Sequence, residues 1–146
     1  MALTKKGRYW YGSGPDDTRA ELLRYSKANA CPATRFAESV CACGHRAFRL
    51  ETDEDAGAAR RTCLACGTVQ LMGDSAEFAD EAEFGGHECV CAAESFELLS
   101  GVALYSDSSD VRWYYLGCRC TACNLVGVFA DWKCEAGDAE AFLAAV

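Results

Sequence analysis

The sequence predicts a small, metal-stabilised α+β protein built from two tandem three-stranded antiparallel β modules. An N-terminal helix and short linker and C-terminal helices complete the expected fold. Two observations predict this class. Eight of the 11 cysteines fall into four short pairs, and the second half of the chain repeats the cysteine spacing and apolar pattern of the first half. A chain of 146 residues divided in this way has little core per module, so bound metal is expected to stabilise the fold.

Five segments are expected along the chain. A basic arm and a helix occupy residues 1–40. The two modules occupy residues 41–72 and 89–134, and an acidic linker with a short helix, residues 73–88, joins them. A last helix is expected in residues 135–146. The two modules therefore contain all eight paired cysteines.

The N-terminal segment contains a basic and aromatic cluster followed by a predicted helix. Packing of its aromatic side chains into the core is one interpretation, and a surface that stacks on a ligand is the other. A helix is expected to start at Pro15 or at the capping-box residue Thr18 and to end near Asn29. The cluster, which is a candidate partner-binding surface, comprises Arg8, Tyr9, Trp10 and Tyr11.

Three strands are expected in each module. In the first, Phe48 and Leu50 alternate with polar residues, which predicts a strand with one apolar face. In the second, residues 111–116 carry apolar side chains on both faces, so this part of the sheet must be covered twice. The first module is one expected cover. The N-terminal segment, or a second chain in a homodimer, is the other.

The repeat also identifies the candidate metal ligands. An offset of 48 residues carries Cys41 and Cys43 onto the third pair, and an offset of 57 carries Cys63 and Cys66 onto the fourth. Two pairs held on neighbouring turns would supply the four thiolates of a tetrahedral metal site. Site 1 is assigned to Cys41, Cys43, Cys63 and Cys66, and site 2 to Cys89, Cys91, Cys120 and Cys123.

The run Cys63-Leu64-Ala65-Cys66-Gly67 resembles a zinc knuckle, and the four pairs together resemble tandem zinc-ribbon or rubredoxin-like modules. The first pair of each module departs from that pattern, because it has one intervening residue instead of two. The resemblance implies a small β fold and two Zn²⁺ ions, with iron as the competing metal. Buried thiols or disulfides are the alternative to metal. Three cysteines lie outside the repeat, and either simple burial or a redox or metal-handling role is open to them: Cys31, Cys118 and Cys134.

Charge is divided unevenly along the chain. The formal net charge is −8, yet residues 1–40 carry 7 basic and 4 acidic side chains. The remaining residues carry 18 acidic and 7 basic side chains, which favours a basic protein partner. The basic arm makes nucleic acid an alternative partner, although an acidic chain is a poor candidate for binding it non-specifically. A second small basic patch is expected on the first module, from Arg49, Arg60 and Arg61.

The sequence therefore predicts a zinc-binding structural or interaction protein and not an enzyme. No phosphate-binding loop, dinucleotide fingerprint or nucleophile–base arrangement stands out, and four thiolates leave no position for a catalytic water. No apolar run is long enough to span a bilayer, and the charged first residues are not followed by the apolar stretch of an export signal, so none is expected. A cytoplasmic location is expected, where thiols persist and cysteine clusters bind metal.

Overall fold

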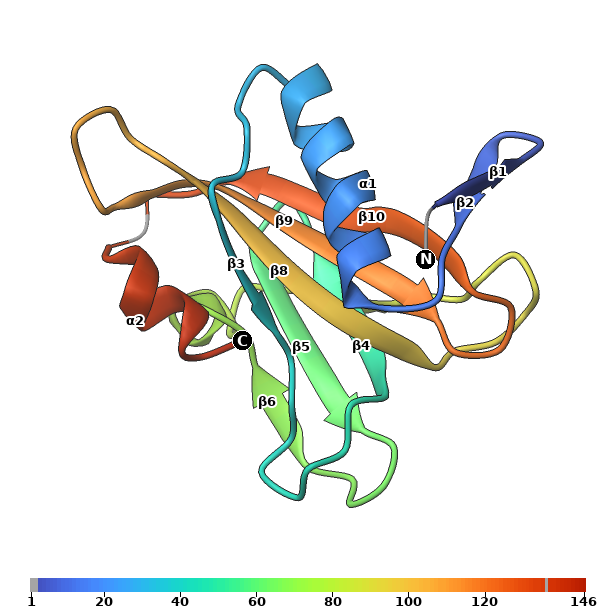
Figure 1. The fold of residues 1–146 in the computed structure, drawn as a ribbon. Helices are drawn as coiled ribbons and strands as arrows, with labels where there is room; N and C mark the ends of the chain where they lie inside the picture. The colour runs from blue at the N-terminus through green and yellow to red at the C-terminus, as the bar shows by residue number, and fades with distance from the viewer. Residues whose placement is uncertain (1–2, 136) are drawn as a thin grey trace.

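The computed structural model describes residues 3–135 and 137–146 (Figure 1). The described residues form ten strands, two α-helices and one 3₁₀ turn, η1. The strands are β1 (Thr4–Lys6), β2 (Tyr9–Tyr11), β3 (Arg35–Glu38), β4 (Phe48–Asp53), β5 (Ala58–Cys63), β6 (Val69–Leu71), β7 (Gly85–Gly86), β8 (Phe96–Leu104), β9 (Val111–Cys120) and β10 (Leu125–Lys133). The helical elements are α1 (Pro15–Ala28), η1 (Ser75–Glu77) and α2 (Ala139–Leu143).

The expected fold class is wrong, because the strands of both modules join one antiparallel sheet. The order of its main strands is β1-β2-β10-β9-β8-β4-β5-β6, while β3 pairs with β8 and β7 pairs with β4. The expected linker helix is also reduced to the single turn η1. The physical reason is that the strands of each cysteine-bearing hairpin carry apolar side chains. The two hairpins bury these side chains against each other in one core.

The two repeats meet at equivalent residues. Phe48 of β4 pairs with Phe96 of β8, and both side chains are fully buried. These residues are 48 positions apart, which is the offset of the repeat. Antiparallel pairing of equivalent residues is what a two-fold axis produces, so β4, β5 and β6 correspond to β8, β9 and β10 across this pair. The duplicated unit is thus arranged as an internal pseudo-dimer.

The β4–β5 hairpin folds over one face of β8–β10 and encloses the main core. A Cβ atom at Gly57, in the turn of this hairpin, would lie 3.4 Å from Trp132 Cδ1 of β10. The main-chain N–H of Asp131 also donates to a carboxylate oxygen of Glu54 in the same turn, at 3.2 Å. These contacts join strands that are three positions apart in the sheet. The first module is therefore one cover of the second, as the apolar faces require.

Helix α1 provides the other cover and lies across β8–β10 (Figure 1). Leu22 is fully buried there, over two glycines of adjacent strands. A Cβ atom at Gly101 would lie 2.7 Å from Leu22 Cδ2, and one at Gly117 would lie 3.2 Å from Leu22 Cδ1. The helix begins at Pro15, the first of the two expected starts. Neither helix in the described part of the chain has the length and apolar character needed to cross a membrane.

Candidate metal centres

The structure gathers the eight paired cysteines into two clusters of four. Within each cluster the four Sγ atoms all lie within 4.8 Å of one another. One cluster is Cys41, Cys43, Cys63 and Cys66, and the other is Cys89, Cys91, Cys120 and Cys123. These are the two sets that the repeat predicts. Both clusters are compatible with metal binding.

The spacing of the sulfur atoms fits a four-thiolate metal site. The Sγ–Sγ separation is 3.5 Å between Cys41 and Cys66, and it is 3.6 Å between Cys89 and Cys123. A tetrahedron with Zn–S bonds of about 2.3 Å has edges of about 3.8 Å. A disulfide would instead need about 2.0 Å. The donor set and its spacing therefore suit a tetrahedral thiophilic ion.

Each cluster has a buried side and an exposed side. Cys41 and Cys63 are 5% and 2% exposed, whereas Cys43 and Cys66 are exposed. The second cluster repeats this division, with Cys89 and Cys120 buried, Cys91 exposed and Cys123 half-buried. A metal ion at either site would thus be anchored to the sheet on one side and face solvent on the other.

The first cysteine pair of each module lies in the same tight turn. The N–H of Cys41 donates to the carbonyl of His45 at 2.9 Å, and the N–H of Gly44 donates to that of Cys41 at 2.8 Å. In the second module the N–H of Cys89 donates to the Ala93 carbonyl and the N–H of Ala92 donates to the Cys89 carbonyl, each at 2.8 Å. Gly44 has φ +91 and Ala92 has φ +72. The short Cys-X-Cys pair is therefore part of a five-residue turn whose fourth residue takes the left-handed conformation.

The second cysteine pair of each module also lies in a repeated turn. Gly67 donates its N–H to the Cys63 carbonyl, and Asn124 donates to that of Cys120, both at 2.9 Å. Gly67 has φ +76 and Asn124 has φ +69. Glycine and asparagine tolerate this conformation better than other residues. Conformation and hydrogen bonding thus repeat together with the cysteines.

Neighbouring donors favour the thiolate forms of several cysteines. The hydroxyl and main-chain N–H of Thr68 lower the pKa of Cys66 to about 6, and Cys66 Sγ lies 3.2 Å from Thr68 Oγ1. The main-chain N–H of Cys66 is the largest cause lowering the pKa of Cys63, and that of Ala93 acts likewise on Cys91. Because metals bind thiolates, these donors favour cation binding at the three cysteines they contact, whereas burial raises the pKa of Cys89 to about 12 and also raises that of Cys123.

Site 1 has a buried cation, and among the described residues site 2 has none at the equivalent position. Arg61 is only 4% exposed, lies over the Phe48 ring at 4.5 Å, and donates Nε–H to the Val146 main-chain oxygen at 2.8 Å. Burial lowers the pKa of Arg61, while the thiolate charges of Cys41 and Cys63 act in the opposite direction. Its counterpart 57 residues later is Cys118, an uncharged and fully buried side chain. Sequence reasoning missed this role, and the signal for it was the mismatch within the repeat.

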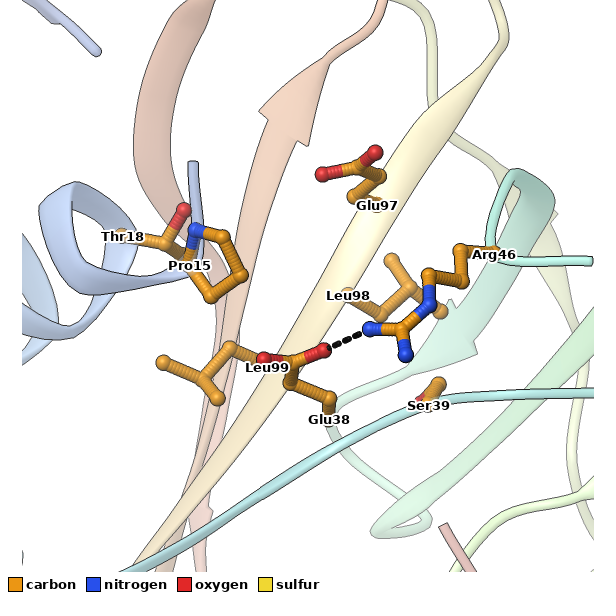
Figure 2. Close-up of a pocket in the computed structure, with 8 residues that line it drawn as sticks. All are labelled: Pro15, Thr18, Glu38, Ser39, Arg46, Glu97, Leu98 and Leu99. Carbon is orange, nitrogen blue, oxygen red and sulfur yellow. Dashed lines mark hydrogen bonds and ion pairs between the residues drawn. The ribbon is translucent and has the colours of Figure 1, made fainter. Parts of the chain in front are cut away.

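An ion pair closes the loop that carries the first cysteine pair (Figure 2). Arg46, just after the turn, reaches Glu38 at the end of β3, just before it. The two side chains line a pocket of about 20 Å³ between this loop, β8 and the start of α1. That volume holds about one water molecule, so the pocket is too small for an organic substrate.

The three cysteines outside the repeat are buried. Cys31 is 7% exposed, Cys118 is fully buried and Cys134 is 4% exposed. Burial raises the pKa of Cys118 well above its ordinary value and that of Cys134 to about 12. All three are free thiols, and each takes part in a core cluster. This placement agrees with the interpretation that they are simple core residues.

The structure does not assemble the basic residues into one surface. Tyr9, Trp10 and Tyr11 form β2, half-buried at the β10 edge, with Arg8 5.3 Å from the Tyr9 ring. The arginines of the first module lie on β4 and β5 at the other end of the sheet order. Arg49 is exposed, Arg60 pairs with Glu51 at 3.0 Å, and Arg61 is buried.

Comparison with known proteins does not add a family to these observations. No family model, curated protein or solved structure matches the chain. The assignment of function therefore depends on the two cysteine clusters and on the surfaces around them.

Proposed function

We propose that the chain is a non-catalytic zinc protein that binds a basic protein partner through its acidic surface. The observation that carries this proposal is the pair of four-cysteine clusters with tetrahedral spacing. Zinc is the commonest ion for such structural sites, and iron is the competitor. Four protein ligands fill the coordination sphere, which supports a structural and not a catalytic ion.

An acidic protein-binding surface is supported by the segment between the two modules. Residues 73–88 carry six acidic side chains and no lysine or arginine. Five of these acids are exposed: Glu77, Asp80, Glu81, Glu83 and Glu88. Each zinc ion with four thiolates would add a net charge of −2, so metal loading makes the protein more acidic still. Such a charge favours association with a basic partner.

Elemental analysis of the purified protein tests the metal assignment. Two zinc ions per chain are expected. Cys66→Ser and the equivalent Cys123→Ser should each reduce the content to one, whereas Cys31→Ser in the core should leave two. Iron in place of zinc, or equal metal loss in all three variants, would contradict the proposal.

Nucleic-acid binding by the N-terminal hairpin is the second candidate, and one observation favours it. The ammonium of Lys5 lies 5.7 Å from the Trp10 ring centroid, and that of Lys6 lies 5.4 Å from the Tyr11 ring centroid. Basic and aromatic side chains in this arrangement can pair with phosphates and stack on bases. A mobility-shift assay across a range of salt concentrations separates the two candidates. Tight, salt-sensitive binding of DNA or RNA would replace the protein-partner proposal.

A further inference from the structure

We propose that the outer edge of β6 binds an extended basic and aromatic segment of a protein partner by strand addition. The inference rests on the proposed function, because it names the surface through which the acidic protein takes its basic partner. β6 is the last strand at one end of the sheet order (Figure 1). A strand in this position presents unpaired main-chain groups that can template another strand.

The free groups on β6 can be identified from its pairing with β5. Met72, just after β6, donates its N–H to the Ala59 carbonyl at 2.9 Å. The N–H and C=O of one residue point to the same side of an antiparallel strand, and the side alternates along it. Val69 and Leu71 therefore direct their main-chain groups away from β5. Among the described residues no hydrogen bond outside the sheet engages these four groups.

The equivalent edge in the second module already carries an added strand. β10 corresponds to β6 through the offset of 57, and β2 pairs antiparallel with it, placing Trp10 opposite Val126. Val126 is the counterpart of Val69. Val126 is 2% exposed beneath this cover, whereas Val69 is 56% exposed and is one of four exposed large apolar residues among those described. The internal pseudo-symmetry thus leaves one covered and one open copy of the same edge.

The strand on the covered edge indicates what chemistry the open edge accepts. β2 consists of three aromatic residues, and the hairpin that contains it carries Lys5, Lys6 and Arg8 and no acid.

The surroundings of the open edge match a segment of this kind. Val69 and Leu71 line a surface groove of about 480 Å³ together with apolar residues of the linker, Ala79, Ala82 and Phe84. The exposed acids Asp80, Glu81 and Glu83 alternate with these lining residues. Among the described residues that line the groove, the one cation is Arg60, which is paired with Glu51 and stacked on Phe84 at 4.3 Å. An apolar groove flanked by acids complements an aromatic, basic strand.

A peptide with the sequence of residues 4–11 is the probe for this surface. Its fluorescein-labelled form should bind the zinc-loaded protein saturably in fluorescence anisotropy. Amide hydrogen exchange of Val69 and Leu71 should slow in the complex. A second peptide, in which glutamate replaces both lysines and the arginine, should not bind.

Val69→Pro is the decisive variant, because it removes one outward N–H and no hydrogen bond to β5. It is expected to weaken peptide binding about tenfold or more, since proline cannot donate to an added strand. Val69→Thr keeps the N–H and serves as the matched control, with binding within a few-fold of the natural chain. Leu71→Pro provides a second test of the same edge. Zinc content and circular dichroism show that each variant is folded.

Four results of the peptide experiments would overturn the inference. They are full binding to Val69→Pro, slowed exchange at Val126 in place of Val69, equal binding of the acidic peptide, and absence of peptide binding. A dimer that needs the Val69 N–H would also overturn it and would make a second copy the occupant. If the protein holds two zinc ions but binds no peptide, strand addition fails while the metal assignment stands.

Discussion

The hydroxyl pair at the centre of the sheet gives a sharp test of the shared core. Ser100 of β8 and Tyr114 of β9 are both fully buried, and their hydroxyl oxygens lie 2.7 Å apart. Tyr114→Phe removes one partner and leaves the Ser100 hydroxyl without one. The Tyr114 ring packs against Trp132 and Phe142 at 5.1 and 5.0 Å between centroids, and these contacts persist in phenylalanine. The cost is therefore that of one orphaned hydroxyl, about 1–3 kcal/mol.

A double-mutant cycle with chemical denaturation measures this quantity. Ser100→Ala orphans the tyrosine hydroxyl and should also cost about 1–3 kcal/mol, with Tm falling roughly 3–10 °C in each single variant. The double variant buries no unpaired hydroxyl, so its loss should be clearly smaller than the sum of the two. Additive losses, or single variants within about 0.5 kcal/mol of the natural chain, would refute the argument that these two buried hydroxyls depend on each other for a hydrogen bond.

Three further predictions follow from individual contacts. Arg61→Leu should lower the free energy of unfolding by about 1.5–3 kcal/mol, because a charged hydrogen bond is lost. Arg49→Leu, on the exposed face, should change that free energy by less than about 0.5 kcal/mol. Urea denaturation of the metal-loaded variants measures both changes. Asp53 accepts a hydrogen bond from the Glu83 N–H at 2.9 Å, and this donor is the largest cause lowering the pKa of Asp53. Asp53→Ala should therefore speed proteolysis at Glu83 at neutral pH. Equal cleavage rates would contradict the role of this hydrogen bond in holding the linker. Fewer than one thiol per metal-loaded chain should react rapidly with a disulfide reagent, because the three non-repeated cysteines are buried. Rapid reaction of three thiols would instead favour the redox role for these cysteines. Those cysteines are Cys31, Cys118 and Cys134.

The cysteine clusters were predictable because their geometry is local. A Cys-X-X-Cys pair followed by glycine or asparagine specifies a turn, and a turn places two sulfur atoms within a few ångströms of each other. The repeat then supplied the partner for each turn. Gly67 and Asn124 adopt the positive φ that their residue types favour. Ala92 adopts it too, although alanine gives no such signal, and only the alignment with Gly44 would have indicated this turn.

The way in which the repeats combine was not predictable from the same pattern. Phe48 and Phe96 are equivalent positions of the repeat, but no strand pairing between the two modules was predicted. Their pairing with each other joins β4 to β8, and it brings together residues 48 positions apart that no single hairpin turn connects. Equivalence within a repeat does not specify how the two copies meet. The short strands β2 and β3 escaped prediction for a related reason, since each is held by a distant edge and not by its own periodicity.

The positions where the repeats differ explain why one edge is covered and the other is open. In the second module the N-terminal hairpin extends the sheet beyond β10. In the first, the last described residues instead pack beneath β5 and β6, where Arg61 and Ser39 both donate to the Val146 main-chain oxygen. The counterparts of these two donors, Cys118 and His87, cannot reproduce this arrangement, because one is an apolar core residue and the other bonds Thr52 Oγ1 at 2.7 Å. The substitutions thus explain why the C-terminal residues pack on a face of the first module and not on the equivalent face of the second. The edge of β6 remains available, which is why we propose that edge, and not either cysteine cluster, as the surface that determines partner specificity.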